Sequence, residues 1–347
     1  MNRRNAQPPR VGVCITGQLG RLELAIKLST ILRPLADATG TPLDVALILD
    51  GSHNSTQAVD ITRASNSHVD PTVALFHDNR SALHALRRGR SNTIREIVLR
   101  EVVPTTRGPS WYIRKLGRKP GISIGARAAI HAHQFELLAE CWSALNQVSG
   151  KRRHDVFVRL REDVVSPQRL PATQILSMLR EATANKIAAV VTSGLEVMGG
   201  INDKAAFLNE AAARDFFLAP LDYFKAPIIT LKNVTGTRRP CLVNGHQLNP
   251  ETLLCNFYRA RNLSLLTVPN ILFSPLRLRG INQTCVTGCA KVCHGAAPYC
   301  LDGPASVPDR LWHQGRELAR GATDDGLGAV GSMRVCGAGT SSRCLSQ

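Results

Sequence analysis

The pattern that most restricts the fold stands near the start of the chain. It consists of two apolar runs with a segment of helical periodicity between them. Residues 10–20, RVGVCITGQLG, predict a buried strand that ends in a glycine turn. Residues 24–35 carry leucines and an isoleucine at spacings of four, three and four, which is typical of the apolar face of a helix. Residues 43–49 and 72–76 predict two further strands, the first of them covered on both faces. This alternation predicts an α/β fold with a mostly parallel sheet and right-handed crossovers.

Residues with ligand-binding chemistry stand at the ends of the first two predicted strands. Gly17 and Gln18 close the first strand, and Asp50 closes the second. In parallel sheets a ligand binds beyond the carboxyl ends of the strands, and a turn over Gly17 and Gly20 would let backbone amides approach it. The spacing of these glycines fits neither the dinucleotide pattern nor the P-loop pattern. We therefore expect a binding rim at Gly17, Gln18 and Asp50, with no particular ligand indicated by these residues alone.

The segment 154–165, HDVFVRLREDVV, carries the residues most suited to chemistry. Strand alternation puts Arg159, Arg161 and Asp163 on the face opposite to the valines. An apolar strand that ends in Arg-x-Arg-Glu-Asp delivers two guanidinium groups and two carboxylates to its carboxyl end. Arginine binds a diphosphate bidentately, and a carboxylate can hold a divalent cation that bridges such a diphosphate. The alternative is a cluster of surface ion pairs at the end of a strand.

Five segments, spread in order from residue 10 to about residue 280, carry a family resemblance. They are RVGVCITGQLGRLEL, HQFELLAECW, DVFVRLRED, VMGGINDKAAFL at 197–208 and NPETLL at 249–254. Together they resemble an uncharacterised glycosyltransferase-like family related to the GT-A nucleotide-diphospho-sugar transferases. The resemblance implies a Rossmann-like, GT-A-type sheet flanked by helices. It also implies transfer of a sugar from a nucleotide-diphosphate donor to an acceptor, which is a glycan, a protein or a lipid.

The resemblance further implies roles for single residues. The residues that would bind the donor are Gly17, Gln18, Asp50, Arg159 and Arg161. In such enzymes an Asp-x-Asp element after a central strand holds a divalent cation, Mn²⁺ or Mg²⁺. Asp163 matches the second acid and is the predicted metal ligand, whereas Arg161 stands in place of the first. An arginine at this position could itself substitute for the charge of the cation.

Two carboxylates are candidates for the base that takes the proton of the acceptor hydroxyl in an inverting transfer. Asp203 follows a predicted strand at 187–192 and two glycines, where the backbone can approach a ligand closely. Glu251 stands in the sequence Asn-Pro-Glu, a strong helix start with an asparagine cap and proline in the first turn. The simpler alternatives are that Asp203 caps the next helix and that Glu251 complements the helix dipole.

A net charge of +17, from 43 basic and 26 acidic residues, makes nucleic acid a candidate partner. Of the basic residues 34 are arginine and 9 are lysine, a bias that GC-rich coding also produces. Aromatic residues make up 5% of the chain, which is sparse for a base-stacking surface. Residues 80–119 hold eleven basic residues against two acidic ones, as in a solvated surface or in a basic flap over a phosphate-bearing donor. A diphosphate-bearing small molecule accounts for the charge better than nucleic acid does.

The ten cysteines are distributed unevenly. Cys14, Cys141, Cys241 and Cys255 are scattered through the first 280 residues, where lone cysteines act as small buried hydrophobes. The other six lie in the last 63 residues: Cys285, Cys289, Cys293, Cys300, Cys336 and Cys344. Three of these recur every four residues, a poor zinc signature, which favours disulfides in an oxidising compartment over a zinc site.

Signals for the compartment conflict. Four sequons and the cysteine-rich end are compatible with the secretory pathway or the Golgi lumen. The polar first ten residues leave no room for a signal peptide or an anchor helix. No apolar run reaches the length of about 18 residues that a membrane span needs, so we expect no membrane span in this chain.

These observations divide the chain into three expected parts. They are a polar lead at 1–9, a GT-A-like α/β catalytic domain at 10–280, and a cysteine-rich, partly disordered tail at 281–347. The first functional hypothesis is a glycosyltransferase that uses a nucleotide sugar. The second is a non-catalytic relative that binds a glycan or a nucleotide. The third is a basic nucleic-acid-binding protein with a zinc-bound tail.

Overall fold

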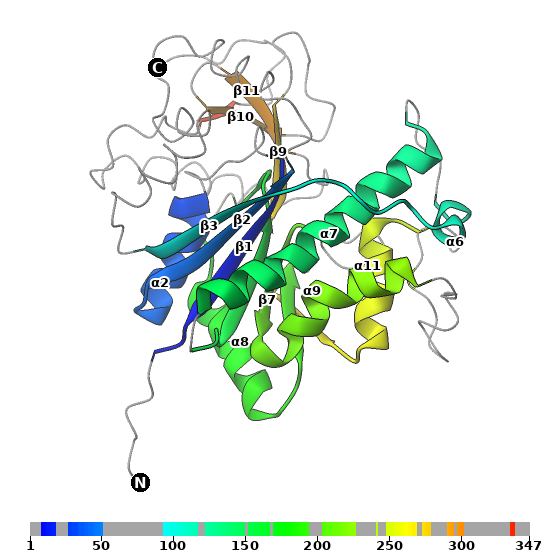
Figure 1. Cartoon of the computed structure of the whole chain (residues 1–347). Coiled ribbons are helices and arrows are strands. Elements are labelled where there is room, and N and C mark those ends of the chain that lie inside the picture. The colour runs from blue at the N-terminus through cyan, green and yellow to red at the C-terminus, as the bar shows by residue number, and fades with distance from the viewer. Residues whose placement is uncertain are drawn as a thin grey trace.

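A seven-stranded mixed sheet forms the centre of the molecule (Figure 1). The computed structural model describes residues 8–18, 27–50, 93–116, 122–149, 152–166, 169–193, 203–226, 241, 248–268, 273–278, 290–294, 297–301 and 334–336. The strands of the sheet lie in the order β3-β2-β1-β4-β7-β6-β8. Their bounds are β1 (Val11–Gln18), β2 (Leu43–Asp50), β3 (Ile94–Val102), β4 (Val156–Arg161), β6 (Ala189–Ser193), β7 (Ala205–Asn209) and β8 (Ser264–Val268).

Most strand pairs in this sheet are parallel. Strands β3, β2, β1 and β4 run in the same direction, and β6 is parallel to β8. Strand β7 is antiparallel to both of its neighbours, β4 and β6. The expectation of a mostly parallel α/β sheet is therefore confirmed, with β7 as its antiparallel member.

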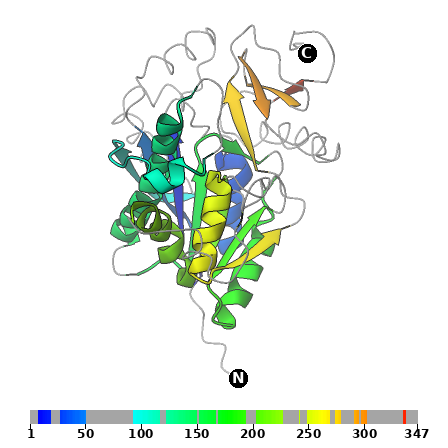
Figure 2. The same ribbon diagram turned by 90° about the vertical axis from the view of Figure 1, so that its right-hand side faces the viewer.

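Helices cover both faces of the sheet, as Figures 1 and 2 show. On one face lie α6 (Ser110–Ile113), α7 (Ile124–Ser149), α9 (Glu210–Lys225) and α11 (Pro250–Ala260). On the other face lie the π-helical turn η2 (Leu28–Leu32), α2 (Arg33–Thr39) and α8 (Ala172–Ala184). Successive strand residues alternate between these two cores because the side chains of a strand point to opposite faces. In β1, for example, Cys14 packs on the α7 side and Ile15 on the α2 side.

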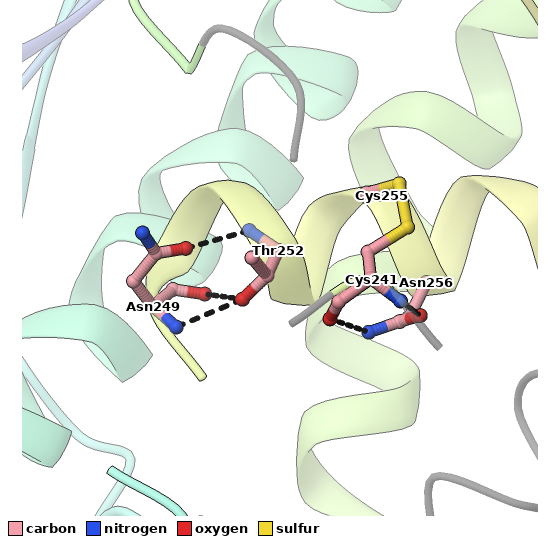
Figure 3. The surroundings of a disulfide bond; sticks show 5 residues. All are labelled: Cys241, Asn249, Thr252, Cys255 and Asn256. Atoms are coloured by element: carbon pink, nitrogen blue, oxygen red, sulfur yellow. Dashed lines mark hydrogen bonds between the residues drawn. A yellow bond between two sulfur atoms is a disulfide. The ribbon is translucent and has the colours of Figure 1, made fainter. Parts of the chain in front are cut away.

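Local sequence signals place the helix ends correctly. Gly40 ends α2 in the left-handed conformation, with φ of 66°, as glycine commonly does at the C-terminus of a helix. Asn249 caps α11, where its side chain accepts a hydrogen bond from the backbone N–H of Thr252 and completes a capping box (Figure 3). The predicted helix start at 249–251 is therefore confirmed.

The edge of the sheet differs from the expectation. The strand predicted at 72–76 lies outside the described residues. On the side away from β1, β2 pairs with β3, which lies within the basic segment 80–119 that had been interpreted as a solvated surface or a basic flap. Its sequence IREIVLREV places two Arg-Glu pairs on either side of a central apolar stretch, and only Ile97 is buried, as suits a charged edge strand.

Four cysteines predicted to be lone hydrophobes form two disulfides, and that prediction is wrong. Cys14 of β1 is bonded to Cys141 of α7, and Cys241 is bonded to Cys255 of α11 (Figure 3). Cys14 points to the face of β1 that α7 covers, which brings it to Cys141 across 127 residues of chain. The residue types had indicated burial correctly, and all four are buried.

The last described strands belong to a second, smaller sheet. Its order is β12 (Arg334–Cys336), β10 (Ala290–His294), β11 (Ala297–Leu301), β9 (Ser274–Leu278) and β5 (Val164–Val165). Strand β5 follows β4 after a turn, so the tail strands connect through β9 to the end of the central sheet (Figure 2). Cys285, Cys289 and Cys344 lie outside the described residues, and the disulfide and zinc hypotheses for the tail stay predictions. No described helix has the length and apolar character of a membrane span.

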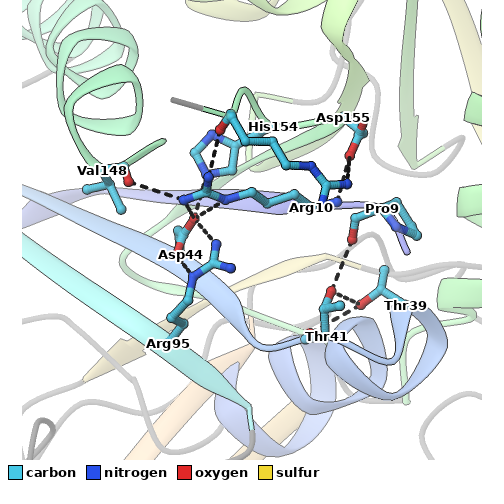
Figure 4. A network of polar contacts seen from close by, with 10 residues as sticks. Pro9, Arg10, Thr39, Thr41, Asp44, Arg95, Val148, His154 and Asp155 are labelled. Atoms are coloured by element: carbon cyan, nitrogen blue, oxygen red, sulfur yellow. Dashed lines mark hydrogen bonds and ion pairs between the residues drawn. The ribbon is translucent and has the colours of Figure 1, made fainter. Parts of the chain in front are cut away.

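The amino end of the sheet is held by a buried carboxylate, Asp44, at the start of β2 (Figure 4). Arg10 Nε donates to Asp44 Oδ2 over 3.0 Å, and His154 Nε2 lies 2.8 Å from the same oxygen. Arg95 of β3 pairs with both carboxylate oxygens. Burial raises the pKa of Asp44, but the hydrogen bonds of His154 and Arg95 outweigh it and lower the pKa to about 2. This cluster joins β2, β3 and the segments before β1 and β4.

Candidate active site at the carboxyl ends of β1 and β4

The sheet has a topological switch point between β1 and β4. From β1 the chain continues to β2 and β3 on one side, and it returns to β4 on the other side. Ligands of open α/β sheets bind in the crevice beyond the carboxyl ends of the strands at such a point. Thr16 of β1 pairs with Arg161 of β4, and the backbone N–H of Glu162 donates to the Thr16 carbonyl over 2.8 Å. The charged end of β4 therefore lies beside the last residues of β1.

Arg161 lies between two aspartates at this end of β4. Its Nη2 donates to Asp163 Oδ2 over 3.0 Å, and its Nη1 donates to Asp203 Oδ2 over 3.3 Å. The exposed fractions of the side chains are 18% for Arg161, 0% for Asp163 and 7% for Asp203. Burial lowers the pKa of Arg161, but the charges of Asp203 and Asp163 outweigh it and raise the pKa above its usual value. The guanidinium is the most exposed member of the group and stays charged.

The segment that carries Asp203 is fixed to β4 by its backbone. The N–H of Arg161 donates to the carbonyl of Lys204 over 2.9 Å, just before the antiparallel pairing of β4 with β7 begins. The sequence predicted both segments to be functional, and the structure brings them together.

Arg159 lies two residues before Arg161 on the same face of β4. The predicted alternation is confirmed within the strand, because Phe157 packs in the core on the α7 side and Val158 in the core on the α2 side. Arg159 is 6% exposed, and burial lowers its pKa although nearby Asp203 raises it. Among the described residues, its Nε has no hydrogen-bond partner. Arg159 thus brings a second, buried guanidinium close to the group around Arg161.

Gly17 belongs to β1 rather than to the expected turn, and it pairs with Leu49 of β2. Its φ of 137° is in a region that favours glycine. A Cβ atom at this position would lie 1.8 Å from Glu162 Oε2, so any other residue would force the buried Glu162 side chain to move. Lys27 is also buried here, and its Nζ donates to the Glu162 carbonyl. Gln18 ends β1 directly opposite Asp50 in the register of the two strands.

Asp50 lies at the end of β2, where it faces α7. His133 Nε2 is 3.6 Å from Asp50 Oδ1, and His133 Nδ1 is 3.2 Å from Glu136 Oε2. Burial raises the pKa of Glu136, but hydrogen bonds from Thr105, Thr106 and His133 lower it to about 2. The two carboxylate neighbours of His133 come from different elements, and nothing in the local sequence reveals that contact.

Glu251 stands in the first turn of α11 and is coupled electrostatically to the same group. Burial, with a further contribution from the charge of Asp203, raises its pKa to about 7. Arg161 and Lys204 act on Glu251 in the opposite direction. Asp203 and Glu251, the two predicted bases, therefore lie in one electrostatic neighbourhood. A carboxyl group with a pKa near neutrality exchanges its proton readily at physiological pH.

Comparisons with known proteins identify no family. No family model and no curated protein matches this chain. Among solved structures, it is similar to the mannosyltransferase PcManGT from Pyrobaculum calidifontis in complex with GDP-Man and Mn²⁺. The TM-score is 0.33 and the identity is 11%, over 77% of this chain and 57% of that one. The chain thus spans little more than half of that protein, and a likeness at this level carries no argument about activity.

The described residues do not fit a divalent cation at the predicted ligand, Asp163. Its side chain is fully buried, and its Oδ2 accepts a hydrogen bond from Arg161. The guanidinium of Arg161 stands between the two aspartates that would have to share a cation. In the described part of the chain, no group of three or more His, Cys, Asp or Glu side chains is placed to hold a metal ion. The expectation of Mn²⁺ or Mg²⁺ at Asp163 has no support in this arrangement.

Proposed function

We propose that this chain is a GT-A-like glycosyltransferase that moves a sugar from a nucleotide-diphosphate donor to a hydroxyl group of an acceptor. One observation carries the proposal. A partly exposed guanidinium, held by two aspartates, and a carboxyl group with a pKa of about 7 occur together at the switch point of an α/β sheet. A cation for a diphosphate and a base for a hydroxyl are what this transfer requires.

The residues divide into a donor side and an acceptor side. Arg161, with Arg159 behind it, would bind the diphosphate, because guanidinium groups pair with phosphate oxygens bidentately. Gly17, Gln18 and Asp50 would form the rim beside the nucleotide, at the ends of β1 and β2.

Of the two candidate bases, Glu251 suits the role better. The carboxylate of Asp203 is already engaged in an ion pair with Arg161 and is 7% exposed, which leaves it poorly placed to meet an acceptor hydroxyl. The pKa of about 7 at Glu251 is close to the value that favours general base catalysis at neutral pH. In a direct displacement, Glu251 would take the proton of the acceptor hydroxyl while its oxygen attacks the anomeric carbon.

The proposal is tested by measuring release of nucleoside diphosphate from a panel of nucleotide sugars, with mixed glycan, peptide and lipid acceptors. We expect one nucleotide class to be consumed by the wild-type protein. The Glu251→Gln variant should still bind that nucleotide but release product at least about a hundredfold more slowly. Equal turnover in the wild type and the Glu251→Gln variant would refute the assignment of the base.

A second candidate function is a non-catalytic nucleotide- or glycan-binding protein. The observation that favours it is the departure from the Asp-x-Asp pattern, with arginine at position 161 and a buried acid at Asp163. Calorimetric binding of a nucleotide sugar without turnover on any acceptor would select this function over the transferase.

A further inference from the structure

The contacts of Arg161 show how its charge is presented. The aspartates engage one nitrogen each, Nη1 and Nη2, and a guanidinium carries further N–H donors on these atoms and on Nε. Because both aspartates hold the same side chain, its position is fixed before any ligand arrives. A preorganised cation with N–H donors that no other group engages is the usual arrangement for binding an anionic oxygen.

The aspartates are not placed to contact a ligand themselves. Asp163 is fully buried, and Asp203 is almost as inaccessible, whereas Arg161 keeps part of its surface exposed. An anion that enters the site therefore meets the guanidinium first. The two carboxylates act on that anion through Arg161, which makes them positioning residues.

Arg159 gives an independent indication that an anion belongs here. A buried guanidinium is costly unless opposite charges and hydrogen bonds compensate it. Arg159 is buried, and in the described part of the chain its Nε has no hydrogen-bond partner. Lys204 adds another positive charge next to Asp203 in the sequence. An oxygen of a bound diphosphate would supply the hydrogen-bond partner that Arg159 Nε lacks among the described residues.

From this geometry we infer that Arg161 takes the place of a divalent cation, so that the donor diphosphate is bound and activated without a metal ion. The inference rests on the proposed transferase function. In the transfer, the acceptor oxygen bonds to the anomeric carbon, and the bond from that carbon to the phosphate oxygen breaks. The electron pair of the broken bond stays on the leaving diphosphate, where Arg161 offsets its charge, and the acceptor proton passes to Glu251.

The test is a calorimetric titration of the full chain with GDP, UDP, GDP-mannose and UDP-glucose, in EDTA and in Mn²⁺. We expect one nucleotide class to bind with the same Kd within about twofold in both buffers. Arg161→Gln should weaken that binding by about tenfold or more, because a charge-assisted hydrogen bond to phosphate is lost. Arg169→Gln is the matched control. Arg169 is an exposed arginine that pairs with Asp37 rather than with Asp163 or Asp203, so its replacement should leave the Kd unchanged.

Two further variants separate binding from folding. Arg161→Gln alone leaves the buried Asp163 without this cation, which could destabilise the fold. The double variant Arg161→Gln/Asp163→Asn removes both charges. It should therefore fold, and it should still bind the nucleotide only weakly. Asp163→Asn alone should reduce the ratio of diphosphate to monophosphate affinity, since it loosens Arg161 without touching the nucleoside. A purely structural role for Asp163 would leave that ratio constant.

The outcomes distinguish this inference from the proposed function. Binding that requires Mn²⁺ would overturn the inference and leave the transferase proposal standing. No binding of any nucleotide in either buffer would overturn both. Binding in EDTA that the Arg161→Gln variant retains at full strength would show that another group carries the diphosphate, and would also overturn the inference.

Discussion

Replacing Glu251 with glutamine should stabilise the folded protein at alkaline pH while it removes turnover. The pKa of this carboxyl group is raised from 4.5 to about 7, first by burial and then by the charge of Asp203. Each pKa unit corresponds to about 1.36 kcal/mol, so ionised Glu251 reduces the free energy of unfolding by about 3 kcal/mol. This figure already includes the favourable backbone interaction at the N-terminus of α11, which lowers the pKa of Glu251. Glutamine should therefore stabilise the protein by about 3 kcal/mol above pH 7.

The gain depends on pH in a defined direction. The folded pKa lies above the unfolded one, so below pH 4.5 the carboxyl group is protonated in both states and costs nothing. The cost grows as the pH rises from 4.5 to about 7, and it is complete above that window. The difference in Tm between variant and wild type should therefore be about 5 °C at pH 8 and close to zero at pH 4.5.

Thermal melts at several pH values, followed by circular dichroism, measure this difference. Glu210→Gln is the matched control, because Glu210 is also a first-turn glutamate of a helix, α9, but its side chain is half exposed. It should lower the Tm slightly at all these pH values and leave turnover unchanged. Two results would refute this electrostatic argument. In the first, the Glu251→Gln variant is no more stable than the wild type at pH 8. In the second, the variant gains as much stability over the wild type at pH 4.5 as it does at pH 8.

Three further perturbations test the framework around the site. Asp44→Asn should reduce the free energy of unfolding by about 2 kcal/mol at pH 7, since the pKa of Asp44 is lowered from 3.8 to about 2. In urea titrations this loss should be complete above pH 3.8 and fade as the pH falls toward 2, and a loss that does not change with pH would contradict it. Gly17→Ala should lower the Tm through its positive φ and its contact with Glu162, and adding Glu162→Ala should recover only the steric part. Full recovery in that double variant would show that the backbone is not strained. Replacing both Cys14 and Cys141 with alanine should cost about 5 kcal/mol, because the disulfide closes a loop across 127 residues. Unchanged urea unfolding, with the wild-type disulfide verified by mass spectrometry, would argue against that contribution.

Local patterns predicted the parts of the fold that depend on neighbouring residues. The apolar runs at 10–20 and 43–49 became β1 and β2, because a strand covered on both faces needs apolar side chains on both. The helix ends at Gly40 and Asn249 followed from backbone conformations and hydrogen bonds that a few adjacent residues decide. Strand β3 was missed because an edge strand is half solvated, and its charged residues resemble a surface segment.

Contacts between distant residues could not be predicted in the same way. The pairing of Arg161 with Asp203 joins residues 42 positions apart, and it depends on β7 running antiparallel to β4. The sequence indicated both residues as functional but assigned the first to the donor and the second to the acceptor. The structure unites them, and it also shows that Asp163 is buried under Arg161 rather than open to a cation.

By itself, the sequence determined the α/β class, the charged residue types at the end of β4 and the helix start that carries Glu251, because these depend on residue type and on periodicity along the chain. Only the tertiary structure decided which charges meet. The order of the strands, the disulfide between Cys14 and Cys141 and the burial that raises the pKa of Glu251 are properties of packing. Burial and electrostatic coupling depend on distance in space, and that distance is set only when the sheet and its helices assemble.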